Sequence, residues 1–197
     1  MNQEKIMDSL LEAGNGYLFT SAVMENGISS MQLASYVKSR NMERIAHGVY
    51  ISDDVWPDEL YLLSQKNKNA IFSHETALFL HGLMEREPVR ISMTVCPNYN
   101  ATHLRKRGIR VYQVKDELFT LGICNVKTNF GNPVNVYDKE RSICDIVKNR
   151  RNMDVQTFQT AMKEYMQNRD KKLPILMQYA QKLGIDEKMK QYVEVML

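Results

Sequence analysis

Residues 20–40 read TSAVMENGISSMQLASYVKSR, and they decide the fold of the N-terminal part of the chain. Asn26 and Gly27 are residue types that tolerate the left-handed backbone conformation, so they predict a sharp turn. Ser29, followed three residues later by Gln32, is a capping-box pattern that predicts the start of a second, longer helix. A short helix, a turn and a longer capped helix form the plan of a helix-turn-helix.

The flanking segments extend this plan on both sides. Apolar residues recur with helical spacing over 3–13, which predicts a first helix, and 17–19 suit a short strand. Residues 42–52 hold two β-compatible pieces around a turn at 46–48, which is the pattern of a wing. We therefore expect a winged helix-turn-helix over residues 1–52.

The rest of the chain predicts an α+β fold with a small sheet and C-terminal helices. Helical patterns at 58–66 and 74–81 suggest that residues 53–82 are connecting helices and that 83–197 form a C-terminal domain. β-branched stretches bounded by Pro, Asn and Gly predict strands at 89–95, 109–114, 123–129 and 134–137. From residue 138 onward the apolar spacing is helical again, so three or four helices should follow.

The composition is that of an ordinary globular protein, with 197 residues, 44% of them hydrophobic and 25% charged. The apolar runs are far shorter than the ~20 residues of a membrane span, and the start lacks the features of a signal peptide. We expect a cytoplasmic protein without membrane association. The three cysteines are odd in number and widely spaced, which favours reduced thiols over disulfides or a zinc site.

The net charge of +3 is unevenly distributed along the chain. Residues 1–52 hold four Lys/Arg against five Asp/Glu, 53–81 hold two against five, and 82–197 hold twenty against thirteen. The N-terminal part alone therefore neutralises few phosphates. Any affinity for nucleic acid that depends on counterion release needs the C-terminal half.

The second helix of the pair has a polar side that suits DNA. At ~100° per residue, Leu33, Ala34 and Val37 fall on one side and Tyr36 on the flank. The opposite side is free of carboxylates, as a helix that enters a major groove requires. Together with the wing, this helix gives the candidate DNA-binding residues Met31, Gln32, Ser35, Tyr36, Lys38, Ser39, Arg40, Arg44 and His47.

Different roles are expected within this set. The Gln32 amide can donate and accept at an adenine edge, and Ser35 can contact several bases less selectively. Lys38 and Arg40 suit phosphates, and Arg44 and His47 in the wing suit the DNA backbone or a narrow minor groove. The alternative is an ordinary helical pair with a glycine turn, whose polar face is only solvated.

Two basic clusters in the C-terminal half are candidate phosphate contacts. They comprise Arg105, Lys106, Arg107 and Arg110 beside a predicted strand, and Lys148, Arg150 and Arg151 at a predicted helix end. On the same side as the predicted recognition helix, they would supply the counterion release that the N-terminal part lacks. The alternatives are a solvated loop for the first cluster and compensation of a helix dipole for the second.

No catalytic motif is recognisable in the sequence. The four histidines are scattered, and His74 and His81 have no obvious third ligand, which argues against a metal site. There is no phosphate-cradling glycine loop, and Asp116 and Glu117 lack the further residues of a two-metal nuclease. We expect no catalytic residues, no metal and no cofactor, and therefore a binding protein rather than an enzyme.

Several segments resemble the AbiEi-type antitoxins. In the N-terminal part these segments are GYLFTSA at 16–22, the helix at 29–40 and IAHGVYI at 45–51. Further on they are FSHETALFLHGL at 72–83, RISMTV at 90–95 and SICDIV at 142–147. The resemblance implies a type IV toxin-antitoxin system of abortive phage infection with a nucleotidyltransferase-like toxin. It also implies an antitoxin that represses its own operon through inverted repeats and opposes the toxin without forming a stable complex.

Residues and resemblance together predict an antitoxin and transcriptional autorepressor. We expect a monomer or weak dimer that assembles on operator DNA, with the antitoxin activity in residues 83–197. The alternative is a winged-helix transcriptional regulator whose C-terminal domain senses a ligand or dimerises and which has no toxin partner.

Overall fold

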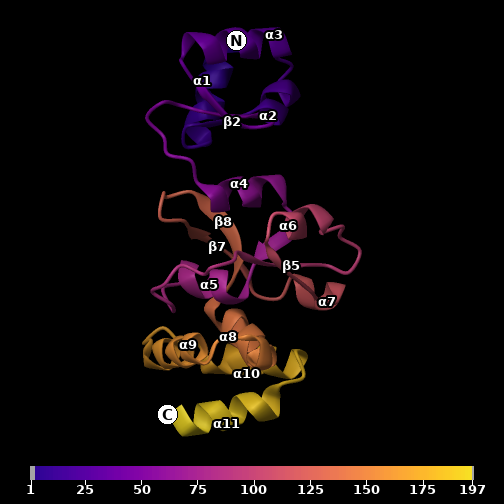
Figure 1. The fold of residues 1–197 in the computed structure, drawn as a ribbon, viewed down its shortest axis with the longest axis vertical. Helices are drawn as coiled ribbons and strands as arrows, with labels where there is room; N and C mark the ends of the chain where they lie inside the picture. Colours follow the sequence, from indigo (N-terminus) through magenta and orange to yellow (C-terminus); the bar gives the residue numbers. More distant parts are fainter. Residues whose placement is uncertain (1–2, 197) are drawn as a thin grey trace. The chain divides into compact units, whose positions relative to one another are not determined.

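The computed structural model describes residues 3–196 and has the α+β class that the sequence predicts. The chain forms two compact units, residues 1–59 and 60–197 (Figure 1). This division falls later than the predicted boundary at residue 52, and residues 60–82, which the sequence assigns to a connector, belong to the second unit. Among residues 3–196, no helix combines the length and the apolar character needed to cross a membrane.

The first unit alternates helices with short strands. Its elements are α1 (Gln3–Ala13), β1 (Tyr17–Phe19), α2 (Thr20–Glu25), α3 (Ser30–Ser39), β2 (Glu43–Ala46) and β3 (Val49–Ile51). The bounds of α1 and β1 are those predicted. Thr20 is the first residue of α2, and the cap position falls on Phe19, whose side chain makes no capping hydrogen bond.

The strands of the first unit form an antiparallel sheet in the order β1-β3-β2. A tight turn joins β2 to β3, and in it Gly48 has a φ of +70°, which glycine adopts without steric cost. The backbone N–H of Thr20 donates to the Gly48 carbonyl at 2.9 Å. The hairpin is therefore fixed to the start of α2.

The turn between α2 and α3 has the predicted chemistry. Gly27 has a φ of +74°, and Ser29 caps α3. The Ser29 hydroxyl accepts from the backbone N–H of Gln32 at 3.3 Å, and Oε1 of Gln32 accepts from the backbone N–H of Ser29 at 2.9 Å. The capping box is therefore confirmed.

A small apolar core fixes the helices of the first unit. Its buried members are Met7, Leu18, Val23, Ile28, Leu33, Tyr36 and Met42. The sequence places Ala34 inside and Tyr36 on the flank, but Ala34 is exposed and Tyr36 is buried. The reason is that Tyr36 also reaches α1, where it contacts Asp8, so the buried stripe of α3 is rotated toward α1.

A five-stranded mixed sheet organises the second unit. In spatial order its strands are β6 (Arg110–Gln113), β5 (Ser92–Val95), β4 (Ala70–Phe72), β8 (Pro133–Tyr137) and β7 (Ile123–Lys127). β4 is parallel to β8, and β5 is parallel to β6, whereas β4 with β5 and β7 with β8 are antiparallel. Four of these strands lie in predicted stretches. The sequence does not reveal β4, because its three residues are all buried and show no alternation.

Helices complete the second unit. They are α4 (Glu59–Lys66), α5 (His74–Leu80), α6 (Thr102–Lys106), α7 (Asp116–Phe119), α8 (Lys139–Lys148), the 3-10 turn η1 (Arg150–Asn152), α9 (Val155–Gln167), α10 (Leu173–Lys182) and α11 (Asp186–Met196). Figure 1 shows α9, α10 and α11 gathered beyond α8 at the end away from the sheet. The predicted C-terminal helices are thus confirmed, whereas α6 and α7 were not predicted.

Helix α8 lies at the centre of the second unit. Every residue from Glu140 to Val147 is buried, and α5, α9, α10 and α11 all contact the helix. Its apolar residues join those of the surrounding helices in the main core. Because water does not reach them, its polar side chains must find partners within the protein.

Replacing Ser29 by Ala removes the side-chain acceptor at the start of α3. We expect the free energy of unfolding of the first unit to fall by about 1 kcal/mol. Urea unfolding followed by far-ultraviolet circular dichroism measures the loss. Ser30→Ala is the matched control, since Ser30 is exposed and lies outside the capping box. Equal losses in both variants would contradict the capping account.

Candidate nucleic-acid interface and a cavity in the second unit

One side of α3 is exposed, and no residue of the helix is acidic. We call Met31, Ala34, Ser35 and Lys38 the outer face of α3; all four are exposed, Met31 to 79%. The sequence predicts three of them as DNA contacts and misses Ala34. Short side chains with a single cation give a helix surface that can enter a major groove.

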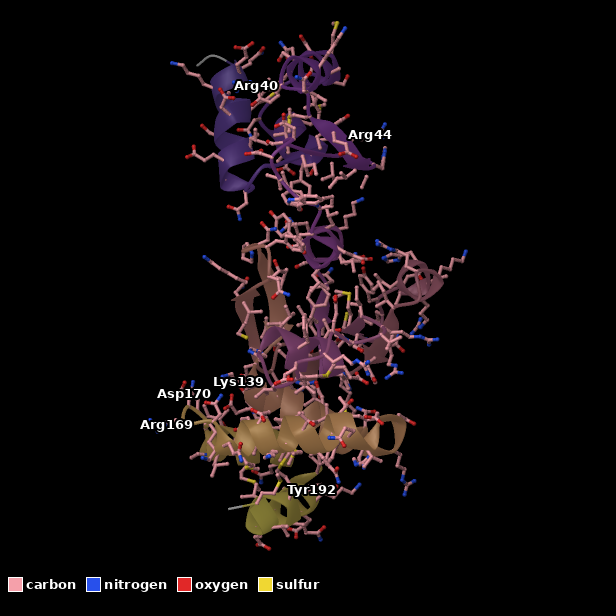
Figure 2. All side chains as sticks on the ribbon, turned by 60° about the vertical axis from the view of Figure 1, so that its left-hand side comes forward. Arg40, Arg44, Lys139, Arg169, Asp170 and Tyr192 are labelled. Atoms are coloured by element: carbon pink, nitrogen blue, oxygen red, sulfur yellow. The ribbon has the colours of Figure 1, made fainter. Side chains whose placement is uncertain are left out.

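Tyr36 and Arg40 face α1 instead. Tyr36 is only 4% exposed, and its hydroxyl donates to the Asp8 carboxylate at 2.6 Å. Burial and this hydrogen bond raise the pKa of Tyr36 to about 12. Arg40 pairs with the same carboxylate at 2.8 Å (Figure 2). Tyr36, which the sequence predicts as a DNA contact on the flank of α3, is therefore buried against α1, and the charge of Arg40 is partly compensated.

The best sequence candidate for base reading, Gln32, is engaged in structural contacts. Its Oε1 belongs to the capping box with Ser29, and its Nε2 donates to Oε1 of Gln3 on α1. The Ser39 hydroxyl donates to a backbone carbonyl of α3 at 2.9 Å. Glu4 and Ser35 both line the groove between α1 and α3, so a carboxylate of α1 lies near the Ser35 edge of the outer face. These contacts leave the outer face as the surface of α3 that is free for a ligand.

The hairpin of the first unit keeps its two predicted contacts together. Arg44 and His47 are both exposed, and Nη2 of Arg44 lies 3.1 Å from Nδ1 of His47. Figure 2 shows Arg44 at the outer edge of the strands. The pair therefore offers polar groups beside α3 within the same unit.

The first basic cluster is divided between a helix and a strand. Arg105 and Lys106 lie at the end of α6, so this part of the cluster is helical and not a loop. Both residues are exposed, and Arg107 follows them on the surface. Arg110 begins β6 and pairs with Glu75 at 2.8 Å. A phosphate contact by this cluster stays a prediction.

The second basic cluster borders a cleft of about 410 Å³. Lys148 donates to the Leu183 carbonyl at 3.2 Å, and the Arg150 guanidinium lies 4.5 Å from the centre of the Phe158 ring. Arg151 is exposed. Lys188, Tyr192, Gln191 and the asparagines 149 and 152 complete the polar wall, and none of the described lining residues is acidic. The cleft therefore favours anions.

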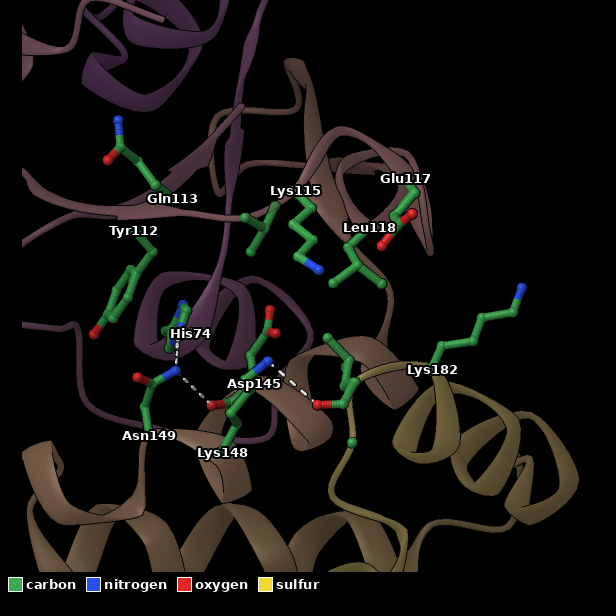
Figure 3. A pocket seen from close by; sticks show the side chains of 13 residues that line it. His74, Tyr112, Gln113, Lys115, Glu117, Leu118, Asp145, Lys148, Asn149 and Lys182 are labelled. Atoms are coloured by element: carbon green, nitrogen blue, oxygen red, sulfur yellow. Dashed lines mark hydrogen bonds between the residues drawn. The ribbon is translucent and has the colours of Figure 1, made fainter. Parts of the chain in front are cut away.

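A cavity of about 430 Å³ lies beside α8, with His74 in its wall (Figure 3). The His74 ring stacks on Tyr112 with 3.4 Å between ring centres. Its backbone has a φ of +51°. This left-handed conformation is uncommon for residues other than glycine, and such residues are often found at functional sites. The sequence segment around His74 gave no sign of this strain.

Hydrogen bonds fix the tautomer of His74. The amide nitrogen of Asn149 donates to the Asp145 carbonyl at 3.1 Å and also lies 2.9 Å from Nε2 of His74. Because this nitrogen is a donor, Nε2 accepts and Nδ1 carries the proton, which it donates to the Ser73 hydroxyl at 3.0 Å. Burial, with Arg141 and Arg110 nearby, lowers the pKa of His74 to about 3. The ring is therefore neutral at physiological pH.

Asp145 forms the floor of the cavity. Its Oδ1 accepts from Nε of Arg141 at 2.9 Å, while Oδ2 of Asp145 and Nη2 of Arg141 are both buried without a hydrogen-bond partner in the described part of the chain. Burial raises the pKa of this carboxyl group, and the Arg141 charge opposes the shift. Figure 3 shows the carboxylate directed into the same space as the Lys115 ammonium group.

Sequence reasoning missed this cavity. Asp145 and Asn149 lie one turn apart on α8 and its C-cap, whereas Tyr112 comes from β6, and no spacing in the sequence brings it to the other two. Within residues 3–196, no three His, Cys, Asp or Glu side chains gather closely enough to hold a metal ion.

No protein-family model matches the chain, and no curated protein matches it. The fold is similar to that in the crystal structure of the RV2827C protein from Mycobacterium tuberculosis, with a TM-score of 0.56 and 11% sequence identity. The match covers 89% of this chain and 70% of that chain. At this identity the similarity concerns the fold alone.

The low pKa of His74 predicts an acid-sensitive fold. The folded-state pKa of about 3 lies below the unfolded value of 6.5, so between these values the unfolded chain binds a proton that the folded chain does not. Stability is therefore lost as the pH falls below 6.5, by at most about 1.4 kcal/mol per pH unit from this group. We expect His74→Asn, which tolerates positive φ, to lose less stability between pH 6.5 and 4 than the wild type. Urea unfolding at several pH values measures the difference, and parallel curves would refute it.

Proposed function

We propose that the first unit is a winged helix-turn-helix that binds operator DNA, and that the chain is an antitoxin and transcriptional autorepressor. The observation that carries the DNA-binding part is the outer face of α3, which is exposed and without carboxylates beside a hairpin with an exposed Arg44. A winged helix-turn-helix needs this combination of a groove-entering helix and a flanking wing.

Each residue of the outer face suits a particular contact with DNA. The Ser35 hydroxyl can hydrogen-bond to several bases, and the Ala34 and Met31 side chains suit the methyl group of thymine. Lys38 suits a phosphate oxygen, and Arg44 suits the backbone or the narrow minor groove. Direct reading thus shifts from Gln32, the best candidate of the sequence, to Ser35 and its neighbours.

Charge places a limit on the affinity of a single copy. Residues 1–52 carry slightly more acidic than basic groups, so one first unit releases few counterions and binds weakly. Two copies on paired half-sites combine their contacts and bind more tightly. We therefore propose an inverted-repeat operator upstream of the chain's own gene, on which two copies assemble.

The antitoxin part of the proposal rests on the sequence resemblance to AbiEi-type antitoxins, which extends through β5 and α8. The matching segment at 142–147 is completely buried, so it supports a shared core and offers no contact surface. We propose that the surface of the second unit opposes a nucleotidyltransferase-like toxin in the cytoplasm, without a stable complex.

A second candidate function is a winged-helix regulator that senses a ligand and has no toxin partner. The cavity beside His74 favours it, because its volume of about 430 Å³ is in the range of small-molecule sites. The two candidates differ in what the neighbouring gene encodes. The antitoxin requires a toxin gene beside its own, and the chain should relieve the growth arrest that this toxin causes; the ligand-sensing regulator has no such partner.

Gel-shift titration with DNA from upstream of the gene tests operator binding. Lys38→Ala should weaken the shift and reduce the salt slope by about 1, since it removes one phosphate contact. Ser35→Glu should weaken binding roughly tenfold or more, because its carboxylate faces the phosphates.

Matched controls lie on α1. Lys5→Ala and Ser9→Glu make the same chemical changes at exposed positions away from the outer face. We expect both controls to bind as the wild type does. Equal losses in the controls and the α3 variants would mean that charge alone, and no defined contact of α3, governs binding.

Repression and antitoxicity should be separable in the full chain. A Ser35→Glu, Lys38→Ala double variant should release a reporter placed behind the operator, yet it should still restore the growth of cells that express the toxin. Reporter output and colony growth measure the two activities in one strain. Loss of both activities by a stably folded variant would contradict the assignment of antitoxicity to the second unit.

A further inference from the structure

The cleft of about 410 Å³ that is lined by the end of α8, the turn η1 and helix α11 carries four cations in its wall. Three of them follow one another closely along the chain, and α11 contributes the fourth; they are Lys148, Arg150, Arg151 and Lys188. Within residues 3–196, none of the four forms an ion pair with a carboxylate. The fold therefore gathers positive charge from two separate parts of the chain in one place.

The ends of the surrounding helices do not account for this charge. Lys148 donates to the Leu183 carbonyl at the end of α10 at 3.2 Å. A helix C-terminus carries roughly half a negative charge, so the ends of α8 and α10 together offset about one of the four cations. The remaining cations repel one another, and grouping them is unfavourable unless an anion binds between them.

The acidic side chains that are near the cleft in the sequence do not cancel its charge. Glu187, beside Lys188 on α11, pairs with Lys190 at 2.9 Å. Asp186 precedes Lys188 by two positions, and residues two apart on a helix do not face each other. Asp154, which follows η1, caps α9 through a backbone N–H group. The cleft therefore stays positive on balance.

Arg150 is held in place before any ligand binds. Its guanidinium lies 4.5 Å from the centre of the Phe158 ring, and Nη1 donates to the Met153 carbonyl at 3.3 Å. A guanidinium group has five N–H donors in a fixed plane, so this contact uses only one of them. A side chain that is already ordered loses little entropy on binding. Arg150 therefore suits the parallel hydrogen bonds that phosphate oxygens accept.

The number of cations indicates the charge of the ligand. A single phosphate group carries up to about two negative charges, which would leave part of the positive charge without a counterion. Asn152 and Gln191 add amide donors to the wall, and Tyr192 adds a hydroxyl group. Several adjacent phosphate groups match both the charge and the donors.

The shape of the site favours a small molecule over a nucleic-acid strand. A strand is bound by cations that follow its backbone along a groove, whereas these four cations line one cleft. The volume of this cleft is in the range of small-molecule sites.

We propose that this cleft binds a polyphosphate chain, either free or as part of a nucleotide. Arg150 and Arg151 donate to phosphate oxygens, and Lys148 and Lys188 neutralise further charge from α8 and α11. The inference depends on neither operator binding nor antitoxicity. A chain that shifts its operator but binds no polyphosphate overturns this inference alone.

Isothermal titration calorimetry of the full chain with sodium tripolyphosphate tests the site. Salt at about 0.15 M screens non-specific attraction between exposed charges, and divalent cations are omitted because they would compete for the phosphates. We expect tripolyphosphate to bind roughly tenfold or more tightly than orthophosphate, since it contacts more of the four cations. ATP distinguishes the two sources: tighter binding than that of tripolyphosphate assigns the site to nucleotides, and equal or weaker binding assigns it to a free polyphosphate.

An Arg151→Ala, Lys188→Ala double variant should bind tripolyphosphate roughly a hundredfold more weakly, because each substitution removes a charge-assisted contact. Both positions are exposed, so the fold should be kept. The matched control is an Arg169→Ala, Lys163→Ala double variant, which removes the same two charges at exposed positions outside the cleft. We expect this control to bind as the wild type does.

Four results would overturn the proposal. Tripolyphosphate does not bind, orthophosphate binds as tightly, the cleft variant binds as the wild type does, or the control loses as much binding as the cleft variant. A single-stranded RNA of mixed sequence that binds the wild type more tightly than tripolyphosphate, and that the cleft variant no longer binds, would likewise replace it by a nucleic-acid surface.

Discussion

The fully buried guanidinium of Arg141 is the constraint on which the second unit depends. Without water, its charge must be neutralised and its N–H groups must find acceptors in the protein. Nε donates to Asp145 one turn further along α8, and Nη1 donates to the carbonyls of Leu118 at 2.7 Å and Leu121 at 3.1 Å. The Tyr137 ring of β8 lies 4.3 Å from the guanidinium. One side chain therefore fixes α8 to the sheet and to the α7 segment, whereas its Nη2 and Oδ2 of Asp145 are buried without a hydrogen-bond partner among the described residues.

The first unit is held together differently. It has a small apolar core and a capped helix, and its Arg40–Asp8 pair is exposed, so this pair adds little stability. Together with Tyr36, the pair orients α3, because both residues hold one side of this helix against α1. The Asp8 carboxylate is consequently held on that side, and the outer face is left as the approach for nucleic acid.

Local chemistry made much of the fold predictable from the sequence. The capping box at Ser29, the turn at Gly27 and the hairpin depend on neighbouring residues alone, and all three are present. The strand β4 was missed because a short buried strand carries no periodic signal. Tyr36 was misplaced because its partner Asp8 comes from another helix, and the cavity was missed because its residues meet only when β6 and α8 pack together.

Hydroxyl-radical footprinting of the full chain on DNA from upstream of its gene tests the central claim most directly, because it locates the protein on the DNA at nucleotide level. The account predicts two protected patches that are related by an inverted repeat and separated by one helical turn or a multiple of it, as two recognition helices require. Uniform protection, or none at concentrations that saturate binding, would contradict sequence reading by α3.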